Sequence, residues 1–424
     1  MLKKIRRIFK KRASLLLLIF SVMSFYGCTI FFPGDQRIHV SFEHSDTLLL
    51  VVDAGLYPYL KQSVEQYSED LGMEGYTVII AQWDGGVAAD LKNLLEQAYT
   101  ENNIDGALLV GDFPSFWYER YSFGREEEFP CDLYFMDFDA QWLDTDGDGI
   151  YDSHSALNLE IFISRISGNY FELKKYFSKV HAYRAGEVAT EMGAYIFKDD
   201  DWEFYNKGSN FGLNSIYTSV EIIDAQEDTL KSRYLSNLSE AGAEYVYQWM
   251  HSYPPLLLVE NDTFFEYIFT SDIKAENLKG LFYNLFNCSA SRFTEDNLAM
   301  SYLMETDYGL ATIGSTKVGG NYRPEVFHFV LSRSGSWGDA YKTWYNNEGS
   351  RDDQWFMGMV ILGDPMLKVS KGAVQPFTTE LPTDQMASEE EREELVRKIT
   401  KFARNYEEGS FLEYRSENPQ YFRD

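Results

Sequence analysis

Two residues that could together perform nucleophilic catalysis follow apolar segments of the chain. His251 follows the apolar segment 243–250, and Cys288 follows the apolar segment 280–287. A thiol is mostly protonated near neutral pH, and a neighbouring imidazole can generate the thiolate and later protonate a leaving amine. If both segments are neighbouring parallel strands, the two side chains meet beyond the strand ends, where open α/β sheets form their sites. The pair therefore predicts a cysteine nucleophile with a histidine partner.

Two other interpretations of Cys288 stay open at this point. The chain contains three cysteines, which are Cys28, Cys131 and Cys288. In an exported protein, Cys131 could form a disulfide with Cys288, and that bond would exclude the nucleophile. Cys288 could also be a small buried residue near a hydrogen-bonded histidine. The spacing alone does not decide between these three roles.

The sequence DTDGDGIYD, residues 144–152, predicts a calcium site in an acidic loop. Asp144, Asp146 and Asp148 lie at alternating positions, and Asp152 follows four residues after Asp148. The backbone carbonyl of Ile150 completes the first part of an EF-hand-type pattern. The twelfth position is Ser155 instead of a bidentate glutamate, so the last ligand must come from elsewhere. Because close carboxylates repel one another without a cation, we expect a structural Ca²⁺, with a solvated acidic loop as the alternative.

The N-terminal residues 1–27 have the organisation of a secretory signal peptide. Seven basic residues near the start of the chain precede the apolar segment 13–27. The Gly-Cys pair that ends at Cys28 resembles a bacterial lipobox, in which the thiol is lipidated, although the aromatic residues Phe25 and Tyr26 depart from that pattern. We therefore expect an exported lipoprotein of the cell envelope that is anchored through Cys28. A plain signal peptide is the alternative.

The composition indicates a large globular protein and argues against nucleic acid as a partner. Of the 424 residues, 45% are hydrophobic and 16% are aromatic, which supports a substantial core. The formal net charge is −28, whereas binding to phosphate backbones needs a basic surface. We expect the protein to contact the membrane only through the lipid anchor.

After the N-terminal region, strand and helix signals alternate along the chain. The segments with apolar, β-branched strand signals are 47–55, 76–83, 105–112, 132–140, 159–167, 193–201, 215–224, 243–251, 280–291, 309–317 and 362–369. Helical spacing of apolar residues occurs in 59–72, 88–102, 171–185, 225–240 and 294–305, and twice within 322–348. Nearly continuous apolar strands are typical of parallel sheets covered on both faces. The pattern predicts an α/β fold with mostly parallel sheets flanked by helices.

The C-terminal part of the chain predicts a linker followed by one amphipathic helix. From residue 371 the composition shifts to threonine, proline and acidic residues. Ser388 and Glu391 have the spacing of a capping box. The apolar residues that recur at helical spacing after this box are Leu395, Ile399, Phe402 and Tyr406. Because an isolated helix of this length is marginal, we expect it to dock on the body or on a partner.

The order of these motifs resembles the gingipain-type cysteine peptidases of the caspase-haemoglobinase fold. The motifs are a strand that ends at His251, a second strand that ends at Cys288, GLATIGSTK at 309–317 and LGDPML at 362–367. LLVGDFP and LEIFISRISG, further upstream, resemble the N-terminal subdomain of that family. The resemblance covers about residues 47–369. It implies the following organisation: signal peptide 1–27, lipid-anchored tether 28–45, N-terminal α/β subdomain 46–189, caspase-like catalytic domain 190–370, and linker with C-terminal helix 371–424.

The resemblance also implies roles for individual residues. Cys288 would be the nucleophile, His251 the acid/base partner, and the backbone N–H groups of Cys288 and Ser252 the oxyanion donors. The family normally has glycine directly after the histidine, so Ser252 is a departure from the pattern. Asp199, Asp200 or Asp201 would select a basic substrate side chain, with a solvated loop or a cation site as the alternative. Ser315 and Thr316 would line the substrate cleft. The alternative is that they only form a turn.

These observations lead to two hypotheses of function from different classes. The first is a lipid-anchored extracytoplasmic cysteine endopeptidase that acts on a protein or peptide substrate without an organic cofactor. The second is a surface lipoprotein that keeps the gingipain-like scaffold and binds a peptide or protein partner without cleaving it. An acyl-transfer or self-processing role of the same cysteine and histidine is a third alternative.

Overall fold

The computed structural model describes residues 28–31, 37–40, 46–261, 264–369 and 387–407. The predicted signal peptide and almost all of the predicted linker lie outside the described residues. Contacts divide the chain into a small unit, residues 1–44 with 378–383, and a large unit, residues 45–377 with 384–424. In the small unit, β1 (Cys28–Phe31) pairs antiparallel with β2 (Arg37–Val40). Among the helices that the structure describes, none has the length and apolar character needed to cross a membrane.

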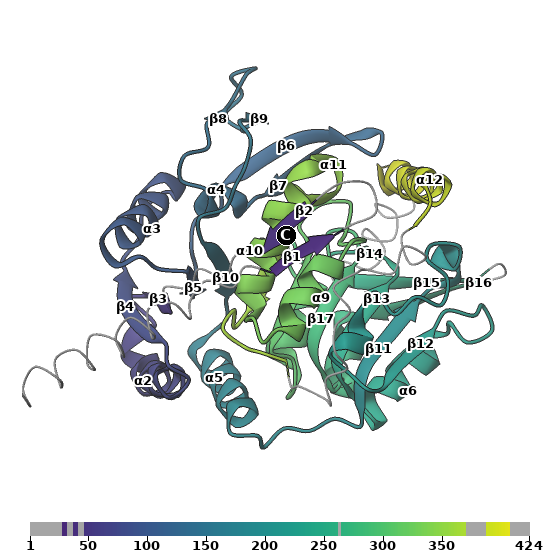
Figure 1. The fold of residues 1–424 in the computed structure, drawn as a ribbon, viewed down its shortest axis with the longest axis horizontal. Coiled ribbons are helices and arrows are strands. Elements are labelled where there is room, and N and C mark those ends of the chain that lie inside the picture. The colour runs from purple at the N-terminus through teal and green to yellow at the C-terminus, as the bar shows by residue number, and fades with distance from the viewer. Residues whose placement is uncertain (1–27, 32–36, 41–45, 262–263, 370–386, 408–424) are drawn as a thin grey trace, which may run out of the picture. The chain divides into compact units, whose positions relative to one another are not determined.

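The large unit is built on one ten-stranded sheet (Figure 1). In sheet order, the strands are β12 (Val220–Ile223), β11 (Met192–Lys198), β13 (Ala243–Trp249), β17 (Gly280–Phe286), β18 (Ala311–Ser315), β19 (Met359–Gly363), β10 (Phe162–Ile166), β5 (Gly106–Val110), β3 (Thr47–Asp53) and β4 (Thr77–Trp83). Most of these strands are buried throughout, because helices flank the sheet. The predicted α/β class with mostly parallel strands is confirmed.

One antiparallel pair divides this sheet into two halves of opposite direction. β18 pairs antiparallel with β19, while every other neighbouring pair in the sheet is parallel. The carboxyl ends of β13 and β17 therefore lie at one edge, and the carboxyl ends of β10 and β19 lie at the opposite edge. The boundary predicted at residue 190 falls just before β11, but the sheet continues across it. The two predicted α/β units thus share one sheet.

The predicted helix 294–305 is reduced to the short α8 (Leu298–Met300) and a π-helical turn at Ser301–Glu305, and α7 (Thr270–Glu276) was not predicted. The other helices lie mostly where the sequence pattern places them. They are α2 (Tyr57–Met73), α3 (Ala88–Asn102), α5 (Tyr170–Arg184), α6 (Lys231–Glu240), α9 (Glu325–Ser332), α10 (Trp337–Asn347) and α12 (Glu389–Glu407). Capping residues determine where several of these helices begin. Asn169 caps α5 by accepting from the backbone of Phe171 and Glu172, and its own N–H donates to the carboxylate of Glu172. Ser388 with Glu391 forms the predicted capping box of α12.

Two of the predicted strands are wrong. Residues 132–140 contain the short helix α4 (Leu133–Met136), whose apolar side chains are buried. Asp132 precedes this helix and holds Arg165 through two bonds of 2.7 Å, a long-range pairing that a local pattern does not reveal. Residues 362–369 are mostly a loop, because β19 ends at Gly363, just before Pro365.

Besides the short pair of β8 (Trp142–Leu143) and β9 (Ser153–His154), two larger antiparallel assemblies of the large unit were not predicted. The first is a hairpin of β6 (Trp117–Ser122) and β7 (Arg125–Pro130). The second is a three-stranded sheet of β14 (His251–Tyr253), β15 (Leu256–Asn261) and β16 (Phe264–Phe269). The two prolines after Tyr253 form the turn between β14 and β15. This three-stranded sheet begins at the histidine of the candidate site, so it shapes the surroundings of that residue.

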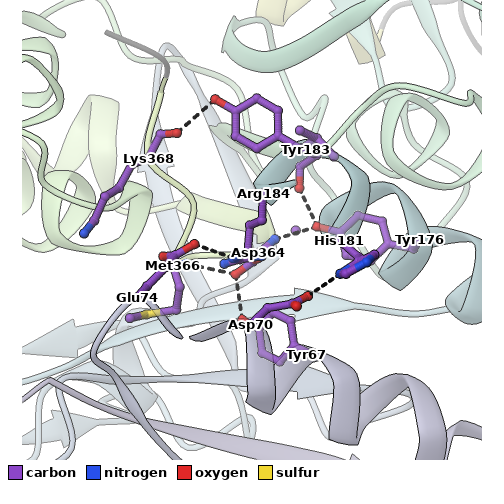
Figure 2. A network of polar contacts seen from close by, with 12 residues as sticks. Tyr67, Asp70, Glu74, Tyr176, His181, Tyr183, Arg184, Asp364, Met366 and Lys368 are labelled. Carbon is purple, nitrogen blue, oxygen red and sulfur yellow. Dashed lines mark hydrogen bonds and ion pairs between the residues drawn. The ribbon is translucent and has the colours of Figure 1, made fainter. Parts of the chain in front are cut away.

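The LGDPML motif has a structural role at the end of β19 (Figure 2). The Asp364 carboxylate accepts hydrogen bonds from Tyr67 at 2.7 Å and from Arg184 at 2.6 Å, and its backbone N–H contacts the hydroxyl of Tyr176 at 2.6 Å. These partners come from α2 and α5, so the motif joins two helices to the sheet. Arg184 also pairs with Glu74 at 3.0 Å.

Candidate active site

The strand register brings His251 and Cys288 to the same edge of the sheet. β13 and β17 are parallel neighbours in which Trp249 lies opposite Phe286. His251 and Cys288 each follow two residues later and are only 4% and 2% exposed. Parallel pairing keeps residues at equal distance beyond a paired position close together.

Hydrogen bonds between the two strand ends hold this register beyond the sheet. Gln248 donates to the side-chain oxygen of Asn287 at 2.7 Å, and Asn287 donates to the carbonyl of Met250 at 2.7 Å. The hydroxyl of Ser252 donates to the carbonyl of Cys288 at 2.6 Å. All of these side chains are buried, so their mutual bonds fix the segments that carry the histidine and the cysteine.

His251 is held between two aromatic rings and one carboxylate. Its Nε2 lies 3.3 Å from the carboxylate oxygen Oδ2 of Asp201. Trp202 contacts the ring with a centroid distance of 4.6 Å, and Phe402 stacks on it at 4.2 Å and 17°. Among the described residues, Nδ1 is buried and has no hydrogen-bond partner. Since the carboxylate can only accept, Nε2 carries the proton in the neutral ring and Nδ1 keeps a free lone pair.

The electrostatics of this pair favour a neutral histidine and an ionised aspartate. Burial lowers the pKa of His251, although Asp201 partly opposes this shift. Burial raises the pKa of Asp201, but hydrogen bonds from His251 and Lys398 lower it more, to below its usual range. A neutral imidazole with a free Nδ1 is able to accept a proton from a nearby thiol.

Cys288 is a free buried thiol. Both Cys131 and Cys288 are unpaired cysteines, so the alternative of a disulfide between them is wrong. Burial raises the pKa of the Cys288 thiol to about 12, and the backbone N–H of Gly319 only partly opposes this shift. The thiol is therefore protonated at neutral pH. In the described part of the chain, no hydrogen bond joins its sulfur to His251, so a thiolate–imidazolium pair is not preformed.

The backbone around Cys288 has features suited to an oxyanion site. Within the described ranges, the backbone N–H of Cys288 donates no hydrogen bond. Ser289, the next residue, adopts a positive φ of 56°, which few non-glycine residues do. Ser252 is fully buried and does not have a positive φ, so its side chain needs no left-handed backbone. Serine in place of glycine therefore gains a hydrogen bond to the carbonyl of Cys288 without local strain.

The predicted acidic residues of 198–202 lie in three different environments. Asp199 is buried, and its Oδ2 accepts from the backbone of Glu260 at 2.9 Å. Asp200 borders a hollow with Glu203 and the start of α12. Asp201 faces His251, so its placement suits orientation of the histidine as well as contact with a basic side chain.

A cavity of 460 Å³ opens beside His251 and has acidic and aromatic walls. Its lining residues are Asp201, His251, Tyr253, Leu258, Glu260, Phe265, Tyr267, Arg397, Lys398, Lys401 and Phe402. Burial, followed by the neighbouring Asp201, raises the pKa of Glu260 to about 7. Asp201, His251 and Glu260 each offer an atom that could bind a metal, all within 4.8 Å of one another. The ammonium group of Lys398 already contacts Asp201 there at 2.7 Å.

Ser315 and Thr316 lie away from this cavity. Both are fully buried, and Thr316 donates to the carbonyl of Pro130 at 2.7 Å. Ser315 accepts from the backbone N–H of Lys317 at 3.2 Å. These bonds hold the loop after β18 next to the cysteine, because the N–H of Ser289 donates to the carbonyl of Lys317 at 2.8 Å. Neither side chain lines the 460 Å³ cavity.

The acidic loop brings its carboxylates together. Oxygens of Asp144, Asp146 and Asp148 lie within 4.8 Å of one another, and backbone N–H groups of the loop hold each of them. Asp152 and Asp146 form a second such group with Glu119 of β6, which is 8% exposed. Burial and the charges of Asp148 and Asp146 raise the pKa of Glu119.

Glu119 and Glu260 are the site residues that sequence reasoning missed. Glu119 lies on an unpredicted hairpin, far from the acidic loop in the sequence, and no local pattern marks it. Glu260 lies on β15, a strand that was not predicted either. Both enter their clusters through tertiary contacts, which a single sequence does not encode as a motif.

Comparisons with known proteins identify a family for this chain. Residues 44–370 match the family model described as peptidase family C25, which is more than half of the chain. No curated protein matches the chain. A solved structure of a transcriptional regulator protein of the LacI family from Rhizobium etli aligns with 79% of this chain and 100% of its own, at 11% identity. Its TM-score of 0.18 is too low to indicate a common fold.

Proposed function

Because the chain belongs to peptidase family C25, which implies a cysteine endopeptidase with a protein substrate, we propose that Cys288 and His251 perform its chemistry. The observation that carries this proposal is the register of β13 and β17, which ends in these two residues at one edge of the sheet. Asp201 orients the imidazole through Nε2 and leaves Nδ1 as the nitrogen that exchanges protons.

The first half of the proposed reaction acylates the cysteine. Nδ1 of His251 removes the thiol proton as the sulfur attacks the carbonyl carbon of the peptide bond. The resulting oxyanion accepts hydrogen bonds from the free N–H of Cys288 and from the N–H of Ser252. The protonated imidazole then donates its proton to the leaving amine, the C–N bond breaks, and a thioester remains on Cys288.

The second half hydrolyses the thioester. Nδ1 of His251 removes a proton from water, whose oxygen attacks the thioester carbonyl. The C–S bond then breaks, the sulfur takes back the proton, and a carboxylic acid product leaves. Because burial raises the pKa of the Cys288 thiol, proton transfer to His251 must accompany the attack on the substrate. A substrate that excludes water and positions its carbonyl makes this transfer favourable.

A non-catalytic binding protein is the second candidate function. The buried protonated thiol and the lack of a bond from its sulfur to His251 within the described ranges favour this alternative. On this hypothesis, the 460 Å³ cavity binds a peptide or protein segment without cleaving it.

We also propose that the acidic loop binds a structural Ca²⁺ ion. The carboxylates of Asp144, Asp146, Asp148 and Asp152 and the carbonyl of Ile150 would hold it, and Glu119 supplies the carboxylate that Ser155 cannot. Hard oxygen donors suit this ion. Burial, followed by the charges of Asp148 and Asp146, raises the pKa of Glu119, and a cation would relieve the repulsion among these carboxylates.

The proposed location is the extracytoplasmic side of a membrane, with a lipid anchor on Cys28. The basic and apolar N-terminal sequence and the Gly-Cys pair support this proposal. Mass spectrometry of the purified protein tests it, because cleavage before Cys28 and two or three added acyl chains give a defined mass. An unmodified thiol on Cys28 would contradict the anchor.

Cleavage of a peptide library by matched cysteine variants tests the catalytic proposal. Cys288→Ala is expected to reduce kcat on the order of 10⁶-fold, as removal of a covalent nucleophile does. Cys131→Ala is the control, because Cys131 is also a buried free thiol. Equal cleavage by Cys288→Ala and the wild type would overturn the proposal. If neither the wild type nor the variant Lys398→Glu/Phe402→Ala cleaves any peptide, the binding function is favoured.

A further inference from the structure

Helix α12 packs an apolar face against the edge of the sheet that carries the candidate site. Leu395, Ile399 and Ala403 of this helix are at most 2% exposed, so the face is buried. Figure 1 shows α12 in yellow beside β15 and near the turn of the β6–β7 hairpin. Residues of α12 and β15 line the same cavity, which places the helix over His251.

Phe402 of α12 covers the ring of the proposed acid/base histidine. The two rings are nearly parallel, with a centroid distance of 4.2 Å and an angle of 17°. Trp202 contacts the same imidazole at 4.6 Å. Phe402 also contacts Tyr253 of β14 at 5.4 Å, so its ring fills the space in front of the histidine. A substrate backbone that approaches this side of His251 would have to displace Phe402.

Basic residues of α12 complement the acidic wall of the cavity. Lys398 contacts Asp201 at 2.7 Å on Oδ1, while His251 lies 3.3 Å from Oδ2. Glu260 lies on the same wall, and Lys401 of α12 lines the cavity opposite it. The helix therefore supplies the cation that compensates the carboxylate of the proposed site.

The two ends of the helix are held by separate parts of the large unit. Near the start, the carboxylate of Glu391 accepts from the backbone of Asn206 at 3.2 Å. Near the end, Arg404 and Thr400 lie against Gly124, where an added side-chain carbon would come within 3.0 Å of Arg404. Gly124 has a φ of 80° and forms the turn of the β6–β7 hairpin. The helix thus spans the mouth of the site, and it is held near both of its ends.

We propose that α12 is a built-in inhibitor that occupies the substrate side of His251, and that peptide cleavage requires its displacement. This inference rests on the proposed function of Cys288 and His251. The helix blocks the site sterically and electrostatically: Phe402 covers the imidazole, Lys398 neutralises Asp201, and both side chains line the cavity. A covered state and an uncovered state then compete, and their populations set the observed activity.

The full-length double variant Lys398→Glu/Phe402→Ala tests the inference. Its control is Glu393→Ala, which changes an exposed residue of the same helix. Modification of histidines by diethyl pyrocarbonate, read by mass spectrometry, reports the cover without relying on catalysis. His181, whose side chain is 46% exposed, and the fully buried His328 serve as internal references. Peptide cleavage is measured on the same samples, with and without the added Cys288→Ala change.

We expect the double variant to increase both His251 modification and kcat/KM by about tenfold or more, with no change in Glu393→Ala. Increased modification without any cleavage would support the inference and contradict the proposed peptidase. Unchanged modification and cleavage, or reduced cleavage despite increased modification, would overturn the inhibitor role. If circular dichroism shows that the double variant does not fold, Lys398→Glu alone gives the same test, because this side chain lies partly at the surface.

A synthetic peptide of residues 388–407 provides an independent measurement. Added to the double variant, it is expected to lower cleavage and to protect His251 from modification. The same peptide carrying both substitutions is the control and should have no effect. Equal effects of the two peptides would contradict a specific inhibitory contact.

Discussion

At one edge of the central sheet, Asp364 has both of its oxygens paired, whereas at the opposite edge His251 and Asp199 keep unpaired polar atoms. Tyr67 and Arg184 donate to Asp364 (Figure 2), and the side chain of Arg184 is only 6% exposed, while Tyr67 and Asp364 are buried. Among the described residues, Nδ1 of His251 and Oδ1 of Asp199 are buried without a partner. Both edges bury charge, and Nη2 of Arg184 at the first edge is also buried without a partner. Among the described residues, however, only the second edge leaves an imidazole nitrogen and a carboxylate oxygen, which can accept a proton, without one.

This difference separates a structural cluster from a functional one. A buried ion pair with good geometry and extra hydrogen bonds fixes the positions of its helices, as Arg184 and Asp364 do for α5 and β19. A buried polar atom without a partner costs free energy, and such costs are concentrated at functional sites. This division predicts that variants at the edge of His251 change the rate of cleavage, whereas variants at the edge of Asp364 change the free energy of unfolding.

Among the variants that compare the two edges, Asp201→Asn is expected to have the largest effect. The asparagine amide can donate to Nε2 of His251, which would leave the proton on Nδ1 and prevent that atom from acting as a base. We expect kcat to fall by about 10⁴-fold, with little change in the free energy of unfolding. The measurement uses the Lys398→Glu/Phe402→Ala background, and Asp200→Asn is the matched control. Retention of most activity by Asp201→Asn would show that this carboxylate does not orient the histidine.

Arg184→Met tests the opposite edge. It leaves the Asp364 carboxylate buried without its cation, so the free energy of unfolding should fall by about 3–5 kcal/mol. Lys175→Met is the control on the same helix, because Lys175 forms a surface ion pair with Asp307, and it should cost less than about 1 kcal/mol. Urea unfolding measures both changes. Cleavage per folded molecule should stay constant, and a rate loss would break the division between the edges.

The sequence allowed prediction of the sheet class and of the strand ends that carry His251 and Cys288. Apolar runs identify buried strands locally, and the His251 and Cys288 runs happen to be sheet neighbours. The reversal between β18 and β19 was not predictable, because strand direction is not written in a local pattern. The same holds for the cover of His251: helical spacing predicted α12, but its target depends on long-range contacts between Phe402, Lys398 and the site.

The acidic loop provides a third way to hold charge, and calcium removal tests it. In the described part of the chain, no lysine or arginine pairs with its aspartates, so a bound ion is the expected compensation. Calcium at 100 times its Kd should raise the free energy of unfolding by about 2.7 kcal/mol over the chelated protein. Glu119→Gln should reduce this increment, whereas Glu126→Gln on the next strand should not. An equal increment in both variants would remove Glu119 from the site.

Glu260→Gln is expected to have the smallest effect, and it distinguishes the two edges by pH. Burial raises the pKa of Glu260 from 4.5 to about 7, so the folded state binds this proton more tightly than the unfolded state. The resulting stability is complete below pH 4.5 and is lost as the pH rises through about 7. Glu260→Gln should therefore flatten the decline in urea midpoint across this window. Glu325, whose burial also raises its pKa to about 7, is present in both proteins and cancels in the comparison.

At the other edge, the cost of Arg184→Met should not change over the same window. Burial lowers the pKa of Arg184, but Asp364, Tyr67 and Glu74 raise it more, so the guanidinium stays charged throughout. The two variants measured side by side from pH 4.5 to 7 thus give one flattened decline and one constant offset. Parallel declines for Glu260→Gln and the wild type would mean that Glu260 does not hold its proton in the folded protein.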